Sequence, residues 1–275
     1  MRYVRGRTNL SATIFVPWDC ENSCPFCTSK QDYKRISCDL EKVQKTISKI
    51  GKSPLFGEWV LTGGEPFANP ESLKAVLVEL EKYEKPVFIN TTAPLSTFND
   101  AVKIINTFGI IQGVNISRHI GYDFRNVASV KDMEQIKKPI RINTVISNGF
   151  TWRNFLDFVY KYGKKKRDIN LRADYRNITY SSLKNRDYVL EKLSKEFDYI
   201  STESCLVCNT EYFSVDNEFL VSYHRGMQYS SVLYPKKVYI NDILVKQDGG
   251  LYRDWDCIPD TNFESFMCGE VVLDG

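Results

Sequence analysis

Six short apolar runs alternate with segments of helical periodicity over the first 173 residues of the chain. The apolar runs predict buried strands at 12–16, 59–62, 86–90, 110–117, 140–147 and 169–173. Apolar residues three and four positions apart predict helices at 39–50, 70–80, 98–108, 130–137 and 152–162, with Asn69 as a cap before Pro70. This alternation predicts an α/β fold with parallel strands joined by right-handed crossovers.

The chain length limits which α/β fold this is. At 275 residues, the chain has room for one α/β domain and a smaller elaboration. An eight-unit barrel does not fit, because too little chain follows the sixth strand. Periodicity alone permits a partial barrel or an open doubly wound sheet. In both, ligands bind at the carboxyl ends of the strands, so the residues that follow each strand are the first candidates for a site.

Three cysteines follow the first predicted strand with C-x3-C-x2-C spacing. They are Cys20, Cys24 and Cys27. Three closely spaced thiolates can hold a [4Fe-4S] cluster and leave one of its irons without a protein ligand. A closed zinc site is the rival interpretation, with Cys38 as the fourth ligand.

A second motif, Gly63-Gly64-Glu65-Pro66, follows the second predicted strand. Glycines let the backbone approach a ligand closely, and a carboxylate accepts charge-assisted hydrogen bonds. Together, the two motifs resemble those of the radical S-adenosylmethionine (SAM) superfamily, and the resemblance covers roughly residues 10–175.

This resemblance implies a partial (β/α)6 barrel, a [4Fe-4S] cluster on the three cysteines, and SAM at the open iron. One-electron reduction would cleave SAM to methionine and a 5′-deoxyadenosyl radical, which abstracts a hydrogen atom from the substrate. It also implies that Phe26 lies beside the adenine of SAM. Gly63 and Gly64 would let the backbone approach SAM closely, and the carboxylate of Glu65 would accept hydrogen bonds from its ammonium group. The electron would come from a donor such as flavodoxin or ferredoxin.

Polar residues at the ends of later strands are further candidates for binding SAM. Asn115 and Ser117 are predicted to reach its ribose, and Arg172 to pair with its carboxylate; Asn143 is also a candidate. The alternative is that they are ordinary strand residues facing a helix or solvent. Asn143 and Arg172 carry more weight, because parallel strands are normally apolar on both faces.

The chain has two histidines, and both are candidate catalytic residues. His119 comes just after the fourth predicted strand, near the expected site. His224 is expected at the tip of a hairpin that folds over the barrel mouth, with a simple surface turn as the alternative.

The α/β alternation stops near residue 200, and we place a boundary between a core barrel at 1–177 and a C-terminal extension at 178–275. Paired β segments at 211–215 and 218–223, and at 238–245 and 250–255, predict a small β-rich cap that covers one side of the barrel. Four cysteines in the extension are either a second metal site or reduced buried thiols: Cys205, Cys208, Cys257 and Cys268.

Composition narrows the substrate and the location. A net charge of +3 argues against a nucleic-acid partner. The first apolar run is too short for a signal peptide or a membrane span, so we expect a cytoplasmic protein. The compact chain favours a small-molecule substrate. Among small radical SAM enzymes, the chain resembles the queuine lyases, which cleave a C–N bond. The alternatives are a peptide-modifying maturase with an auxiliary cluster and a non-catalytic zinc-binding module.

Overall fold

The computed structural model describes most of the chain. The described residues are 2–5, 10–17, 20–27, 29, 36–122, 124–146, 150–163, 167–173, 180–204, 209–224, 231–234, 237–240, 242–253 and 255.

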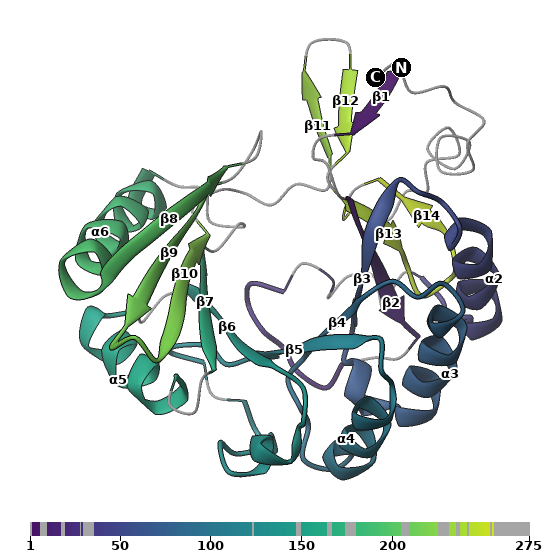
Figure 1. Cartoon of the computed structure of the whole chain (residues 1–275), viewed down its shortest axis with the longest axis horizontal. Helices are drawn as coiled ribbons and strands as arrows, with labels where there is room; N and C mark the ends of the chain where they lie inside the picture. The colour runs from purple at the N-terminus through teal and green to yellow at the C-terminus, as the bar shows by residue number, and fades with distance from the viewer. Residues whose placement is uncertain are drawn as a thin grey trace.

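A curved sheet forms the body of the protein, and its middle consists of six parallel strands in chain order (Figure 1). The six strands are β2 (Leu10–Val16), β3 (Phe56–Gly63), β4 (Val87–Thr91), β5 (Ile111–Ser117), β6 (Ile140–Ile146) and β7 (Asp168–Ala173). Each pairs with the next in parallel. The partial (β/α)6 barrel predicted from the sequence is therefore confirmed.

Helices cover the outer, convex side of the sheet (Figure 1). They are α2 (Leu40–Ile50), α3 (Pro70–Glu81), α4 (Phe98–Thr107), α5 (Trp152–Tyr162) and α6 (Tyr180–Glu196), with a short 3-10 turn, η1 (Pro66–Ala68), before α3. The predicted cap is present, since Asn69 Oδ1 accepts from the backbone N–H of Ser72 at 3.0 Å. Fully buried aliphatic side chains such as Leu61 and Ile47 fill the space between the sheet and the helices. The inner face, by contrast, carries polar side chains on several neighbouring strands, such as Asn143, Asn170 and Ser222.

The helix predicted at 130–137 is wrong in type and length. The structure has a 3-10 helix there, η2 (Asp132–Gln135). The apolar residues Val130, Met133 and Ile136 are spaced by three, which suits a 3-10 helix, and Pro139 disfavours helical backbone at the residue before it.

The sheet continues beyond the six strands at both edges. At one edge, β10 (Phe219–His224) pairs in parallel with β7 and is followed by β9 (Asn209–Val215) and β8 (Asp198–Ser204). At the other edge, β13 (Asp242–Val245) pairs in parallel with β2 and then with β14 (Leu251–Tyr252).

These strands correct part of the predicted C-terminal arrangement. The 211–223 hairpin forms, but it lengthens the sheet instead of covering one side, because the open edge of β7 offers unpaired backbone groups. The strand predicted at 238–245 is divided in two. Its first half, β12 (Lys237–Ile240), forms a separate sheet with β1 (Arg2–Arg5) and β11 (Ser231–Tyr234). The boundary after residue 177 stays a prediction.

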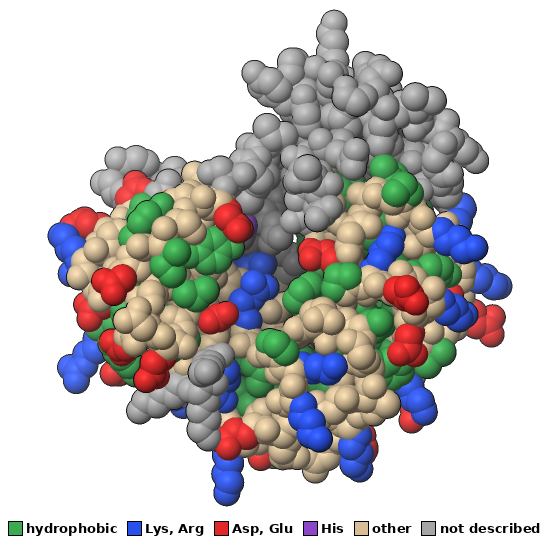
Figure 2. Space-filling view, viewed as in Figure 1, with side chains coloured by type: hydrophobic (Ala, Val, Ile, Leu, Met, Phe, Trp, Pro, Cys, Tyr) green, Lys and Arg blue, Asp and Glu red, His purple; other side chains and the backbone are tan. Residues whose placement is uncertain are grey.

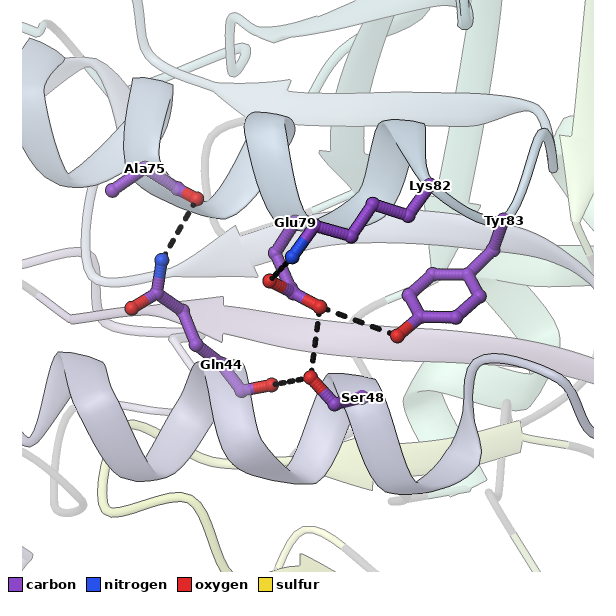
Figure 3. A network of polar contacts seen from close by, with 6 residues as sticks. All are labelled: Gln44, Ser48, Ala75, Glu79, Lys82 and Tyr83. Carbon is purple, nitrogen blue, oxygen red and sulfur yellow. Dashed lines mark hydrogen bonds and ion pairs between the residues drawn. The ribbon is translucent and has the colours of Figure 1, made fainter.

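A polar network joins the outer helices α2 and α3 (Figure 3). Glu79 is 7% exposed and accepts hydrogen bonds from Ser48 Oγ at 2.8 Å, Lys82 Nζ at 2.6 Å and the Tyr83 hydroxyl at 3.2 Å. Gln44 adds a bond from α2 to a backbone carbonyl of α3. Burial by itself raises the pKa of Glu79, but the hydrogen bonds from Lys82, Ser48 and Tyr83 outweigh it and lower that pKa.

We expect Glu79→Gln to lower the free energy of unfolding by about 1–2 kcal/mol at pH 7, because the charge-assisted bonds weaken. A carboxyl whose folded pKa is lowered stabilises the fold above its unfolded pKa, and this contribution disappears as the pH falls through the folded pKa. The difference between parent and variant should therefore shrink below about pH 4, as measured by urea unfolding. Glu81→Gln, at an exposed position on the same helix, should change neither the free energy of unfolding at pH 7 nor its dependence on pH.

Candidate functional site

The cysteine loop follows β2 at the carboxyl edge of the sheet. Cys20, Cys24 and Cys27 are half-buried, and the backbone N–H of Cys27 donates to the carbonyl of Cys24 at 3.1 Å, which closes a turn. Asn22 Nδ2 lies 3.7 Å from Cys20 Sγ and 3.3 Å from the hydroxyl of Thr92. The loop is thereby tied to the end of β4.

The thiols of this loop influence one another. Burial raises the pKa of Cys20, and the negative charges of Glu65 and Cys27 raise it further. Burial raises the pKa of Cys24 to about 11, opposed by a hydrogen bond from the Tyr122 side chain. Three half-buried thiols on one loop, two of which resist ionisation, fit a ligand set for a cationic iron–sulfur group, because its positive charge favours the thiolates.

A closed four-thiolate zinc site fits less well. Cys38 is exposed, whereas the three loop cysteines are half-buried. Within the part of the chain that the structure describes, no three His, Cys, Asp or Glu side chains converge closely enough to hold a single metal ion. A larger cluster does not need such convergence, because its irons spread the thiolates apart.

The Gly-Gly-Glu-Pro segment forms the turn after β3. Gly63 ends the strand with a φ of 124°, a backbone conformation that favours glycine. Glu65 caps η1, with Oε1 accepting from the backbone N–H of Phe67 at 3.0 Å. The turn lies beside the cysteine loop because β2 and β3 are adjacent and parallel.

Glu65 is 3% exposed, and both of its oxygens accept hydrogen bonds from the chain itself. Oε1 also accepts from the hydroxyl of Thr91, and Oε2 accepts from Thr92, through its backbone N–H at 2.6 Å and its hydroxyl at 2.5 Å. Burial raises the pKa of Glu65, and the bonds from Thr91 and Thr92 oppose that rise. The carboxylate therefore joins the ends of β3 and β4. For Glu65 to accept a hydrogen bond from SAM, as predicted, one of these four hydrogen bonds would have to break.

Phe26, predicted to lie beside the adenine, belongs to an aromatic cluster. Its ring centroid is 4.4 Å from that of His119 and 6.1 Å from that of Tyr122, and Phe124 packs against both of these rings. The cysteine loop is thus held against the segment that follows β5.

His119 is held as a neutral imidazole. Its Nδ1 accepts from the backbone N–H of Val145 at 3.2 Å, and burial, with Arg118 nearby, lowers its pKa to about 3. At neutral pH, the ring therefore carries its proton on Nε2. Its contacts with Phe26 and β6 make His119 a positioning residue in this structure, and its catalytic role stays a prediction.

Asn115 and Ser117 lie on β5. The Asn115 side chain is buried, donates to Asn90 Oδ1 at 2.8 Å and accepts from Arg141 Nε at 2.9 Å. Ser117 is half-buried at the end of the strand, and its carbonyl accepts from Arg118 Nη1 at 2.7 Å. Ser117 is nearer the cysteine loop, while Asn115 is held between its neighbouring strands.

Asn143 and Arg172 lie on β6 and β7. Asn143 Oδ1 accepts from Asn170 Nδ2 at 3.0 Å, and Arg172 is level with Val145 on one side and His224 on the other. The two predicted SAM contacts thus lie on neighbouring strands but at different levels, since Arg172 is next to last in β7 and Asn143 is the middle residue of β6.

His224 is not at a hairpin tip. The β9–β10 turn lies at residues 216–218, and His224 is the last residue of β10, level with Arg172, because pairing with β7 extends the strand. Its Nδ1 is 2.8 Å from the hydroxyl of Thr210. Burial, then Arg172 and Arg141, lower the pKa of His224 to about 4, so the ring is neutral at pH 7.

The structure adds residues that the sequence did not single out. Asn22 and Tyr122 contact the cysteine loop, and Arg118 donates to the carbonyls of Thr92 and Ala128 at 2.7 Å each. Two features of the sequence could have identified these contacts: Asn22 lies inside the cysteine motif, and Tyr122 is three residues after His119. The four C-terminal cysteines of the predicted second metal site all lie outside the described residues.

Comparison with known proteins gives one family and a set of solved structures. The model of the radical SAM superfamily matches residues 19–167. SuiB of Streptococcus suis bound to S-adenosylmethionine is similar, with a TM-score of 0.61 and 14% identity over 89% of this chain and 60% of that one. SuiB bound to the precursor peptide SuiA has a TM-score of 0.53 and 18% identity over 68% and 46%, respectively. The chain thus spans less than two thirds of these solved chains, and the likeness shows the fold alone.

No curated protein matches the sequence. Among the helices that the structure describes, none has both the length and the apolar character needed to cross a membrane.

Proposed function

Because the chain belongs to the radical SAM superfamily, we propose that it is an enzyme that cleaves SAM reductively at a [4Fe-4S] cluster held by Cys20, Cys24 and Cys27. The observation that supports this most is the link from the cysteine loop through Asn22 and Thr92 to the Gly-Gly-Glu-Pro turn. Bound there, the cluster and SAM supply the one-electron chemistry that removes a hydrogen atom from the substrate.

The residues of the chain bind, orient and exclude water. Gly63 and Gly64 offer backbone groups for close approach, and Glu65 holds that turn in place. We propose Ser117, Asn143 and Arg172 as SAM contacts on β5, β6 and β7. Neutral His119 keeps Phe26 in position.

For the substrate, we propose a small molecule, and queuine with C–N bond cleavage is the specific compound to test. SuiB was solved with a peptide, but at 18% identity this likeness does not carry a peptide substrate to this chain. Family membership favours an enzyme over a zinc-binding module. We propose a cytoplasmic location and a one-electron donor such as flavodoxin or ferredoxin.

The experiment is anaerobic reconstitution with iron and sulfide, followed by a screen for release of 5′-deoxyadenosine. A true substrate should raise this release above the level seen with SAM and reductant alone, and a new product should appear in the same samples. Queuine and short peptides are tested as substrates in separate assays. Release from peptides alone would replace the small-molecule proposal with the maturase.

A further inference from the structure

The inner face of the sheet between β4 and β9 carries polar side chains in rows that cross neighbouring strands. The register places Asn90, Asn115, Arg141 and Asp168 at one level, and Asp168 Oδ1 accepts from the backbone N–H of Leu220 at 3.0 Å. The next level contains Ser117, Asn143, Asn170, Ser222 and Tyr212. The level nearest the carboxyl edge contains Arg172, His224 and Thr210. A polar face of this extent on a parallel sheet indicates a surface that contacts water or a polar ligand.

Hydrogen bonds hold these side chains in place. Asn170 donates to Asn143, and Ser222 Oγ donates to Asn170 Oδ1 at 3.1 Å. Arg141 donates from Nε to Asn115 and makes no ion pair with any described residue. Its terminal nitrogens carry four further N–H donors in a fork that matches a carboxylate or a phosphate.

The side chain of Arg141 is exposed, yet enough protein surrounds it that desolvation, followed by the charge of Arg172, lowers its pKa. The carboxylates of Asp168 and Glu58 oppose this fall in pKa without outweighing it. Exposure combined with desolvation is characteristic of a side chain on the wall of a hollow. Figure 2 shows Lys or Arg side chains in a hollow between the two ends of the curved sheet, the end with β8, β9 and β10 and the end with β2 and β13. His224 adds no charge at pH 7, and its buried Nε2 has no hydrogen-bond partner among the described residues.

We propose that this hollow binds an oxyanion of the substrate, a carboxylate or a phosphate, through the guanidinium of Arg141. The proposal rests on the proposed reductive cleavage of SAM and names an anionic small molecule as the substrate class, in place of queuine. Guanidinium is suited to this role, because it stays charged and binds such groups with two parallel hydrogen bonds.

The position of Arg141 favours the substrate over SAM as the source of the oxyanion. Arg141 is the second residue of β6, whereas the cysteine loop and the Gly63–Gly64 turn lie at the carboxyl edge. Val145, level with Arg172, is four residues further along β6, about 13 Å at the usual rise of a strand. Because queuine has neither a carboxylate nor a phosphate, the proposal counts against it as the substrate.

Isothermal titration calorimetry on the anaerobically reconstituted full chain tests the proposal, with inorganic phosphate and succinate as separate probes. We expect the parent to bind at least one probe, and the better probe indicates which oxyanion the substrate carries. Arg141→Gln should weaken that binding at least tenfold, and Arg141→Lys should lie between the two. Arg153→Gln, which removes the same charge from the exposed face of α5, should bind the probe like the parent.

Iron content and SAM affinity, measured on the same samples, show whether each variant is intact. The proposal is overturned if the parent binds neither probe, if Arg141→Gln and Arg141→Lys bind as tightly as the parent, or if Arg153→Gln is equally weakened. It is also overturned if Arg141→Gln loses affinity for SAM instead, because Arg141 would then be a SAM ligand. Failure of the proposed function would be distinct, as absence of 5′-deoxyadenosine from the parent; probe binding does not require SAM cleavage.

Discussion

Replacing Cys20, Cys24 or Cys27 singly with alanine is expected to remove nearly all cluster-bound iron and to abolish SAM cleavage. Each thiol is one of three on a single short loop, and water does not replace a thiolate ligand well. The measurement is iron and sulfide content after anaerobic reconstitution, together with 5′-deoxyadenosine formed from SAM. We expect a loss of at least a hundredfold in SAM cleavage.

Cys38→Ala is the matched control. Cys38 is exposed and outside the loop, so this variant should keep both the iron and the activity of the parent. Equal losses for Cys38 and the three loop cysteines would instead support a closed four-thiolate zinc site.

Glu65→Gln is expected to retain the cluster but to weaken SAM binding at least tenfold and to lower the stability of the protein. Both oxygens of Glu65 accept hydrogen bonds from N–H or O–H donors of Phe67, Thr91 and Thr92. In glutamine, an NH₂ group replaces one of these oxygens, so a donor would face a donor. Loss of hydrogen bonds to a buried charge costs about 2–3 kcal/mol, equivalent to a fall of about 5–10 °C in Tm. Anaerobic SAM titration and thermal unfolding measure the two effects.

Glu71→Gln, at an exposed position in the first turn of α3, controls for the loss of a carboxylate and should leave SAM affinity unchanged. A Glu65→Gln protein with parental SAM affinity and parental Tm would show that the hydrogen bonds of Glu65 between β3 and β4 are needed neither for SAM binding nor for stability.

The middle of the fold was predictable because each strand and helix of the (β/α)6 core carries its own local signal. Asn69, Pro70 and the spacing of Leu73, Val76 and Leu77 mark α3 almost to the residue. The C-terminal arrangement was not predictable in this way. Periodicity identifies a hairpin near residues 211–223, but only tertiary pairing makes β10 the neighbour of β7. The two strands are separated by 45 residues of chain, from 174 to 218, so no local pattern indicates that they pair.

In the site, too, residues with a local sequence signal were predictable, and residues that meet only through tertiary pairing were not. Cys20, Cys24 and Cys27 and the turn at Gly63 are adjacent along the chain to strands with a clear signal. Thr92 lies two residues beyond the third predicted strand, and its bonds to Glu65 and Asn22 appear only when β3 and β4 are side by side. Arg141 was not singled out from the sequence, because no local pattern indicates that β5, β6 and β10 share a polar inner face.

The formation of 5′-deoxyadenosine and methionine from SAM by the reconstituted, reduced protein tests the central claim most directly. The parent should contain iron and sulfide and yield the two products in equal amounts, whereas Cys24→Ala should yield neither. A parent protein that takes up iron and sulfide and binds SAM, yet yields no 5′-deoxyadenosine, would contradict the account, as would a Cys24→Ala variant as active as the parent.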